Sequence, residues 1–470
     1  MRGLSIVTTA ILLAACQGNA GEASRFEMPG TTAPLAHRDS SSGKITHVVI
    51  VIQENRSFNN LFYGYPGATT SAYGYDSHGS KIALKPVTLA TTWDLQHNAQ
   101  GFIKACNGTG TIPGTDCRMN GFNRQSWTCG VGTEPQCPNK NPPYSYVPHA
   151  ETKPYFDMAN QYVLADEMYA SDFDTSSFMS HQYIIAGVNP ESSVDYPDGV
   201  WGCPGGPPDQ IKVLGANRQF PSGYEEPCWD PTTLGDELDA SGVSWAYYAS
   251  PVKGYGTLDC GGSPRGDASK GRGGIWSAYQ AIKHICYGPD WSKNVVSPQT
   301  QFLSDVQSGN LRAVSWVTPT YANSDHGGSG SKTGPSWVAS IVNAIGKSQY
   351  WDSTAIVIFW DDSGGWFDPQ APAYVDNDGL GFRLPLLVIS AYAKHGYVSH
   401  VHYEHGSILR FVEDQFGLAR LGASDTRANS LQPDCFDFTQ PPRKFKKIKA
   451  AYGQLYFANQ PLDARPPDTE

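Results

Sequence analysis

Two unbroken apolar runs, each followed by a polar cluster, constrain the fold of this chain most strongly. Residues 47–52 read HVVIVI, and residues 355–360 read AIVIFW. A strand with one face in water alternates polar and apolar residues, whereas uninterrupted runs rich in β-branched residues are typical of strands buried on both faces. We therefore expect two central strands of a sheet that is covered on both sides.

The remaining regular patterns alternate between strand and helix. Two further strand-like runs and two amphipathic helices are expected at 314–317, 384–390, 336–347 and 408–416. The second helix should stop at Gly417, because glycine readily adopts the left-handed conformation that ends many helices. Alternating strands and helices favour a mostly parallel central sheet with helices on both faces. We expect one large α/β domain over residues 44–470, with long loop insertions.

The N-terminal residues 1–16 have the features of an export signal. Arg2 precedes an apolar run, 4–15, that is too short to span a membrane. The run ends in LAAC, which resembles a bacterial lipobox in which Cys16 is lipidated. We expect a lipoprotein anchored to a membrane and facing the periplasm or the cell exterior, with plain secretion as the alternative. Residues 17–43, polar and rich in small residues, predict a flexible tether.

Nine further cysteines agree with export, because disulfides persist in oxidising compartments. Eight of them fall into sequence-neighbour pairs inside loop-like, Gly- and Pro-rich stretches. We interpret 93–150 as a crosslinked loop insertion and 190–275 as a second insertion, which covers the active-site face. The expected pairs are Cys106–Cys117, Cys129–Cys137, Cys203–Cys228 and Cys260–Cys286. Spacing alone leaves the connectivity open, and a zinc site is the alternative. Cys435 should remain free.

Net charge excludes one class of partner. The formal net charge is −10, and an acidic surface repels nucleic-acid phosphates, so we expect no nucleic-acid partner. A phosphate-containing small substrate is not excluded, because a bound cation reverses the local charge within a site.

Oxygen-rich clusters follow both central strands. Glu54 and Asn55 come after the first strand, and Asp361 and Asp362 come directly after the second. Open α/β sheets bind ligands at the carboxyl ends of their strands. Adjacent carboxylates repel each other, and Glu, Asn and Asp oxygens suit Ca²⁺, Mg²⁺ or Mn²⁺. The structural alternative is a helix cap at Glu54 and an Asx-turn at the two aspartates; the pattern leaves both open.

Longer motifs resemble a known family. The stretch HVVIVIQENRSFNNLF is similar to the opening motif of the bacterial phosphoesterase family that includes phospholipases C and an acid phosphatase, within the alkaline-phosphatase-like superfamily. Further motifs follow in the family's order: MNGF, FDTSSFMSHQYIIAG, TPTYANSDHGG and WDDSGGWFDPQAP. The resemblance extends from residue 45 to about residue 445. It implies an alkaline-phosphatase-like α/β fold.

The resemblance also implies a metal site and a nucleophile. The implied ligands of a divalent cation are Glu54, Asn55, Asp361 and Asp362, and the metal stays open among Ca, Mg, Mn, Zn and Fe. Ser177 falls where the family carries its Ser or Thr nucleophile, and coordination to the metal would lower the pKa of its hydroxyl. Ser176 is the neighbouring alternative, and a helix N-cap is the structural one.

Histidines complete the implied site. His326 matches a family histidine that could donate to phosphate oxygens or protonate the leaving group. His97 matches another histidine near the phosphate. His181, four residues after Ser177, is expected to face the same pocket, and Asp325 is expected as a further substrate-binding residue. A structural hydrogen bond is the alternative for each histidine, and for His405 it explains the residue equally well.

Three departures from the family pattern leave the implied ligands and nucleophile untouched: Asn59, Asn120 and the Asp368-Pro369-Gln370 sequence.

We therefore expect an exported metal-dependent phosphoric ester hydrolase, similar to phospholipase C or to acid phosphatase, that forms a phosphoserine at Ser177. The substrate stays open between a phospholipid and a phosphomonoester. The alternative is a non-catalytic surface lipoprotein that binds a glycan or a protein partner.

Overall fold

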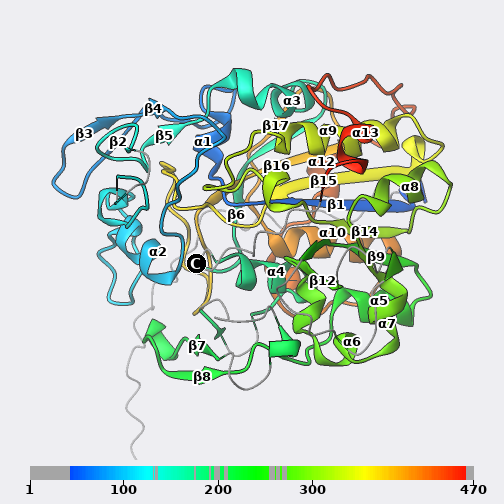
Figure 1. Ribbon diagram of the computed structural model, residues 1–470, viewed down its shortest axis with the longest axis horizontal. Helices are drawn as coiled ribbons and strands as arrows, with labels where there is room; N and C mark the ends of the chain where they lie inside the picture. The colour runs from blue at the N-terminus through cyan, green and yellow to red at the C-terminus, as the bar shows by residue number, and fades with distance from the viewer. Residues whose placement is uncertain are drawn as a thin grey trace, which may run out of the picture. The chain divides into compact units, whose positions relative to one another are not determined.

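A ten-stranded mixed sheet lies at the centre of the fold (Figure 1). In spatial order its strands are β11 (Arg265–Gly266), β13 (Val295–Ser297), β9 (Trp245–Tyr248), β14 (Val314–Val317), β1 (His47–Gln53), β15 (Thr354–Trp360), β16 (Arg383–Ser390), β6 (Val163–Tyr169) and β17 (Tyr397–Ser399), with β18 (Tyr403–Glu404) also paired to β6. The computed structural model describes residues 43–461 except 131, 133–135, 174–175, 190–191, 195–201, 206–209, 253–259, 261–264 and 267–271. These residues belong to one compact unit.

The expectation of a mostly parallel sheet is confirmed, and β16 is the exception. It runs antiparallel to both β15 and β6, whereas the other neighbouring strands are parallel. Residues 361–382, which join β15 to β16, contain no helix. A parallel neighbour would require the chain to cross back to the opposite end of the sheet before the next strand begins. Because β16 begins at the end of the sheet where β15 stops, the two strands are antiparallel.

Helices cover both faces of the sheet, as expected. On β15, the ring of Phe359 lies 5.5 Å from that of His405 in α10 (His405–Phe416), whereas the ring of Trp360 lies 5.0 Å from that of Tyr155 in α3 (His149–Ala159). Successive strand residues point to opposite faces, so α3 and α10 lie on opposite sides. In Figure 1, α9 (Gly334–Gly346) is seen on one side of β15 and α4 (Ser177–Ala186) on the other.

Both predicted central strands and both predicted helices are present. Residues 48–52 of β1 and all of β15 are buried, as expected of strands covered on both faces. Each fully buried Val or Ile contributes about 1.5–3 kcal/mol. Helix α10 begins three residues before the predicted start, because Glu404 and Ser407 form a capping box, and it ends at Gly417 with φ 66°.

Short elements occupy the connections and insertions. The other helices are α1 (Phe58–Phe62), α2 (Ala99–Cys106), α5 (Leu234–Ala240), α6 (Lys283–Cys286), α7 (Pro289–Asn294), α8 (Gln301–Gln307), α11 (Ser424–Arg427), α12 (Gln432–Cys435) and α13 (Gln454–Ala458). The other strands are β2 (Tyr73–Tyr75), β3 (Lys81–Ala83), β4 (Lys85–Pro86), β5 (Ser145–Tyr146), β7 (Ile211–Val213), β8 (Gly223–Glu225), β10 (Ser250–Val252) and β12 (Arg272–Ile275).

The four expected disulfides are confirmed. They join Cys106 to Cys117, Cys129 to Cys137, Cys203 to Cys228 and Cys260 to Cys286. Cys435 is free and buried. The prediction that 190–275 covers the active-site face stays a prediction, since many of these residues lie outside the described ranges.

The N-terminal predictions also fall outside the described residues. These are the signal peptide over 1–16, the lipidation of Cys16 and nearly all of the tether over 17–43. Among the residues that the structure describes, no helix combines the length and apolar character required to cross a bilayer.

Candidate active site

Parallel pairing of β1 with β15 brings the two predicted acidic clusters together. Gln53 lies opposite Trp360 in the register, so Glu54 and Asp361 leave the same edge of the sheet side by side. The N–H of Asp361 donates to the carbonyl of Gln53 at 3.0 Å, and the N–H of Asn55 donates to Asp361 Oδ1 at 3.1 Å. The four predicted ligands are all fully buried at this edge.

Backbone conformation holds Asn55 and Asp362 in contact. Asn55 has a φ of 56°, a left-handed conformation that asparagine tolerates better than most residues. Gly364, with φ 57°, packs against it so closely that a Cβ would overlap the carbonyl oxygen of Asn55. Asn55 Nδ2 then donates to Asp362 Oδ2 at 3.3 Å. The Asx-turn expected as the structural alternative is also present, because the Gly364 N–H donates to Asp362 Oδ1 at 2.7 Å.

Ser177, and not Ser176, presents its hydroxyl to the acidic cluster. Ser177 is the first residue of α4, and its Oγ lies 3.4 Å from Asn55 Oδ1 and 3.3 Å from Asp362 Oδ2. Ser176 is the N-cap residue, but its side chain makes no capping hydrogen bond, and its buried Oγ contacts no hydrogen-bond partner among the described residues. The helix-capping alternative therefore does not explain either serine.

Three carboxyl groups gather at this edge of the sheet, and two of their oxygens lack hydrogen-bond donors among the described residues. Glu54, Asp361 and Asp362 are fully buried, and Glu54 Oε2 and Asp361 Oδ2 accept no hydrogen bond from the described residues. Burial, together with repulsion from Asp361 and Asp362, raises the pKa of Glu54 well above its ordinary value. Uncompensated buried carboxylates cost several kcal/mol each. The donor set therefore fits a divalent cation with oxygen ligands.

His181 belongs to the same cluster. It lies one turn after Ser177 on α4, and its Nε2 is 3.2 Å from Glu54 Oε1 and 3.7 Å from Asp361 Oδ2. Burial lowers its pKa to about 4, so the imidazole is neutral near pH 7 and does not neutralise the carboxylates. One ligand atom from each of Glu54, His181 and Asp361 lies within 4.8 Å of the others. A nitrogen ligand would add Zn²⁺ and Fe²⁺ to the metals that this set suits; the predicted substrate-binding role of His181 stays a prediction.

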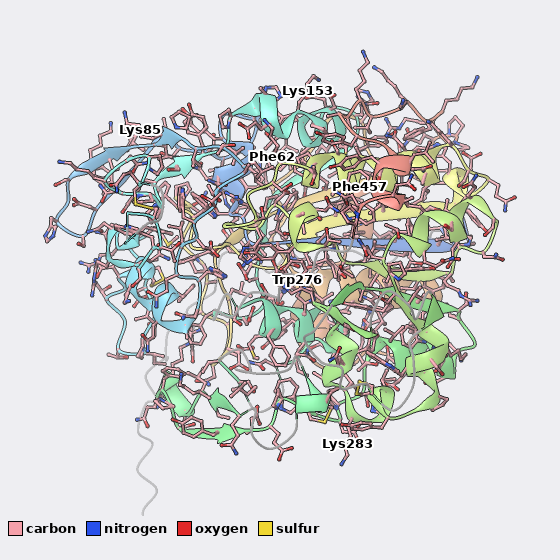
Figure 2. The ribbon with its side chains drawn as sticks, in the orientation of Figure 1. Phe62, Lys85, Lys153, Trp276, Lys283 and Phe457 are labelled. Atoms are coloured by element: carbon pink, nitrogen blue, oxygen red, sulfur yellow. A yellow bond between two sulfur atoms is a disulfide. The ribbon has the colours of Figure 1, made fainter. Side chains whose placement is uncertain are left out.

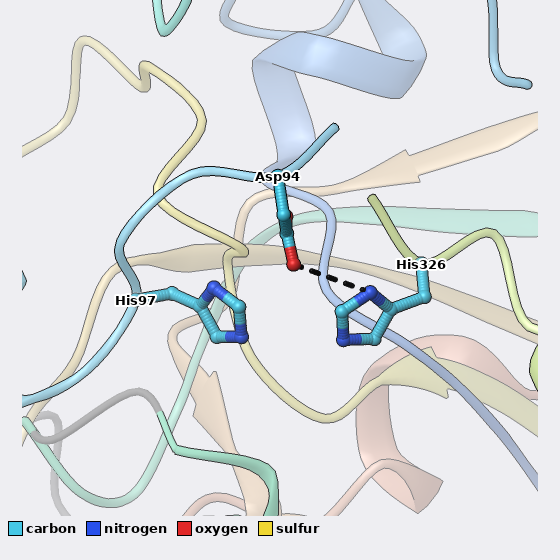
Figure 3. Close-up of side chains that lie close together, drawn as sticks. All are labelled: Asp94, His97 and His326. Atoms are coloured by element: carbon cyan, nitrogen blue, oxygen red, sulfur yellow. Dashed lines mark ion pairs between the residues drawn. The ribbon is translucent and has the colours of Figure 1, made fainter. Parts of the chain in front are cut away.

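A second cluster joins two of the predicted histidines to Asp94 (Figure 3). His326 Nδ1 is 3.5 Å from Asp94 Oδ2, and the rings of His97 and His326 are 5.6 Å apart. His97 Nδ1 lies 2.6 Å from the Leu95 carbonyl, which fixes that nitrogen as the donor. Asp94 was not among the predicted site residues, although its spacing three residues before His97 was a usable signal.

The loop carrying His326 begins beside the acidic cluster. The N–H of Glu54 donates to the Ser324 carbonyl at 2.9 Å. His326 packs parallel to Trp276 at 6.3 Å, and the Trp276 carbonyl accepts a hydrogen bond from Tyr247, whose hydroxyl lies 3.3 Å from His181 Nδ1. The two clusters are thus connected through backbone and aromatic contacts.

Asp325 hydrogen-bonds residues that belong to neither cluster. Its Oδ2 accepts hydrogen bonds from Tyr155 at 2.6 Å and from Gln53 Nε2 at 3.4 Å, and burial raises its pKa to about 6. Its carbonyl accepts from Nε of the buried Arg56 at 2.7 Å. This geometry favours a positioning role for the loop, and the predicted contact of Asp325 with substrate stays a prediction.

Two of the departures from the family pattern meet in one buried network. The N–H of Asn59 donates to Asp368 Oδ2 at 3.0 Å, and Arg383 Nε donates to Asp368 Oδ1 at 3.0 Å. These residues support the start of α1 and of β16. They do not form part of either cluster.

Comparison with known proteins places the chain among phosphoesterases. It is 24% identical over 434 residues to the non-hemolytic phospholipase C of Burkholderia pseudomallei, which covers 82% of this chain and 57% of that protein. It is 23% identical over 454 residues to phospholipase C B of Mycobacterium tuberculosis, covering 86% of this chain and 79% of that protein. The chain therefore matches little more than half the length of the first relative.

Solved structures include more distant neighbours. A protein in the alkaline phosphatase superfamily from Vibrio parahaemolyticus has a TM-score of 0.32 and 12% identity over 58% of this chain and 63% of that chain. The family model described as the Phosphoesterase family matches residues 45–419, which include every residue of the two clusters. This chain belongs to the Phosphoesterase family.

Proposed function

We propose that this protein is a metal-dependent phosphoric ester hydrolase in which Ser177 is the nucleophile. The observation that carries the proposal is the buried Ser177 Oγ, which lies within 3.4 Å of Asn55 and Asp362 at an edge where three carboxylates gather. A hydroxyl surrounded by buried acids is suited to hold a cation with them. Membership of the Phosphoesterase family supports phosphate esters as the substrate class.

The proposed reaction passes through a phosphoserine. Ser177 Oγ forms a bond to phosphorus as the bond from phosphorus to the leaving oxygen breaks. A protonated His326 donates a proton to that oxygen, and the proton of the Ser177 hydroxyl passes to solvent. A divalent cation held by Glu54, Asn55, Asp361 and Asp362 would lower the pKa of the Ser177 hydroxyl and offset phosphate charge. With Nδ1 donating to the Leu95 carbonyl, a protonated His97 would donate from Nε2 to phosphate oxygens, and the N–H groups in the first turn of α4 favour the same negative charge. A water oxygen then forms a bond to phosphorus as the bond between phosphorus and Ser177 Oγ breaks. One proton of that water passes to Ser177 Oγ, the other stays on the released phosphate, and His326 regains its proton from solvent.

Replacing Ser177 with Ala tests the nucleophile. We expect hydrolysis of p-nitrophenyl phosphate and p-nitrophenyl phosphorylcholine to fall by about a thousandfold or more, because the Ser177 hydroxyl lies beside Asn55 and Asp362 and alanine has no group to replace it. Ser176→Ala is the matched control and should retain most activity. Thermal melting should show both variants folded. Activity of Ser177→Ala close to that of the wild type would refute the role.

The same two substrates separate the possible activities. Several relatives are phospholipases C, which favours the phosphodiester p-nitrophenyl phosphorylcholine over the monoester. Preference for p-nitrophenyl phosphate would instead indicate an acid-phosphatase-like enzyme. If neither is hydrolysed with any of the five candidate metals, the alternative of a non-catalytic surface lipoprotein that binds a glycan or protein partner takes precedence.

Export through a lipid-anchored N-terminus is part of the proposal, with residues 44–470 as the single catalytic domain. Four disulfides support an oxidising compartment such as the periplasm or the cell exterior. Cys16→Ser should move the protein from the membrane fraction to the soluble fraction of a bacterial host and abolish labelling by radioactive palmitate. Unchanged labelling of the variant would exclude Cys16 as the anchor.

A further inference from the structure

The C-terminal segment 439–461 has a charge opposite to that of the whole chain. It contains five Lys and Arg residues and no Asp or Glu, whereas the chain has a net charge of −10. Four of the five cations are exposed lysines, here called the lysine strap: Lys444, Lys446, Lys447 and Lys449. Within the described part of the chain, none of them pairs with a carboxylate. Arg443 points inward and donates to the carbonyls of Gln161 and Ala393 at 3.0 and 2.7 Å.

Buried neighbours hold the lysine strap in one orientation. Phe445 packs edge-on against Trp351 at 5.0 Å and lies directly over Gly346 of α9. Ile448 is buried and exchanges two hydrogen bonds of 2.9 Å with the side chain of Asn343. Because Phe445 and Ile448 face α9, the lysines between and beside them face solvent.

Apolar side chains project from the helix that follows. Leu455 in α13 is 80% exposed, and Tyr452 and Tyr456, which stack at 4.1 Å, are 41% and 40% exposed. Phe457 is the buried residue of this helix and packs against Trp337 of α9 at 5.3 Å. Figure 2 labels Phe457 on α13. Packing within the fold therefore does not account for Leu455.

The strap and α13 follow α9 toward the candidate active site. The strap contacts α9 at Gly346 and Asn343, and the N–H of Tyr452 donates to Ser336 Oγ, in the first turn of α9, at 3.4 Å. Beyond α13, Gln460 Oε1 accepts from Asn323 Nδ2 at 2.8 Å. Asn323 lies three residues before His326, so the end of the segment that carries α13 adjoins the loop of the candidate site.

We propose that the lysine strap and α13 dock the protein on a lipid bilayer that contains anionic lipids. Lysines attract anionic head groups within a Debye length, and exposed Leu and Tyr side chains enter the interfacial region of a bilayer. A protein surface that binds nucleic acid would present aromatic rings for base stacking along a basic groove. The acidic remainder of this chain would also repel a nucleic acid. This inference goes beyond the proposed hydrolysis and does not depend on it.

Vesicle sedimentation tests the docking. The full chain is used with Cys16→Ser in every arm, so that a lipid on Cys16 does not bind vesicles. We expect binding to phosphatidylcholine vesicles that contain phosphatidylglycerol, weakening with added salt, and little binding to pure phosphatidylcholine. Replacing all four strap lysines with Gln should reduce the affinity by up to about 600-fold, since each lysine near an anionic surface contributes about fivefold.

A matched variant controls for net charge. It replaces four exposed lysines elsewhere with Gln: Lys81, Lys85, Lys140 and Lys283. This variant should bind as the parent does. Equal loss of binding in the two quadruple variants would overturn the proposal, and so would equal binding of the parent to neutral and anionic vesicles.

Leu455→Asn separates the apolar contribution. It should weaken binding several-fold at both low and high salt, because insertion of an apolar side chain is not screened. Its melting temperature should match the parent's, since Leu455 is exposed. Binding to heparin or RNA that depends on the strap, together with no binding to anionic vesicles, would assign the face to a different polyanion and overturn the proposal.

Discussion

At the scale of single residues, Gly364 shows how little tolerance the candidate site has. With φ 57°, it lies in the left-handed region, and a Cβ there would lie 3.0 Å from the Cβ of Asn55 and overlap its carbonyl oxygen. Asn55 is itself left-handed and hydrogen-bonds Asp362. Two strained positions therefore support each other where the two clusters of oxygens meet.

Gly364→Ala should consequently disturb both stability and the site. We expect a loss of about 2 kcal/mol or more in the free energy of unfolding, with weaker metal binding measured by calorimetry. Gly223→Ala is the control, because a Cβ at Gly223 meets nothing within 4 Å. Unchanged metal affinity in Gly364→Ala would show that Asn55 does not depend on this contact.

At the scale of elements, a histidine joins the start of α6 to the start of α5. His284 Nδ1 lies 2.6 Å from Asp230 Oδ1, and its Nε2 lies 2.8 Å from Asp236 Oδ1, a residue of the capping box of α5. Burial lowers the pKa of His284, but the hydrogen bonds to Asp230 and Asp236 outweigh burial and raise the pKa above its ordinary value. Protonation therefore strengthens this link.

The pH dependence of this link follows from that direction. Because the pKa of His284 is higher in the folded state, its stabilisation is fully present below about pH 6.5, the unfolded value, and is lost as pH rises through the folded value. His284→Gln should lower the melting temperature more at pH 5 than at pH 9. His395→Gln, at an exposed histidine, should show no such difference. An equal effect of His284→Gln at both pH values would contradict the assignment.

At the scale of the whole molecule, the acidic cluster joins segments from distant parts of the chain. Glu54 follows β1, His181 lies on α4 and Asp361 follows β15. Repulsion among the buried carboxylates opposes folding when no cation is bound. A cation that binds only the folded state would stabilise that state by mass action.

Metal removal should therefore lower global stability as well as activity. We expect a chelator to reduce the melting temperature, and saturating metal to restore it, with a gain of about 2.7 kcal/mol at a hundredfold excess over Kd. Asp361→Asn should reduce this response strongly. Asp352→Asn, which changes an exposed carboxylate, should preserve it. A melting temperature unaffected by chelation would argue against the metal site.

Local patterns determined a large part of this protein from sequence alone. The uninterrupted runs at 47–52 and 355–360 predicted buried strands, because only a strand covered on both faces needs every residue apolar. Acidic residues directly after two such strands predicted their meeting at one sheet edge, because parallel strands end together. Pairing each cysteine with its neighbour in the sequence predicted the four disulfides, whose partners are 8 to 26 residues apart.

Tertiary structure alone decided the contacts between distant segments. The direction of β16, the association of Asp94 with His326, and the position of His181 beside Glu54 depend on sheet order and helix orientation. The distinction between Ser176 and Ser177 has the same origin, because Ser176 is the extended N-cap residue and Ser177 is the first residue of α4, so their side chains point in different directions. Sequence determines such local periodicities, whereas the direction in which a side chain faces a distant partner is set only when the elements pack.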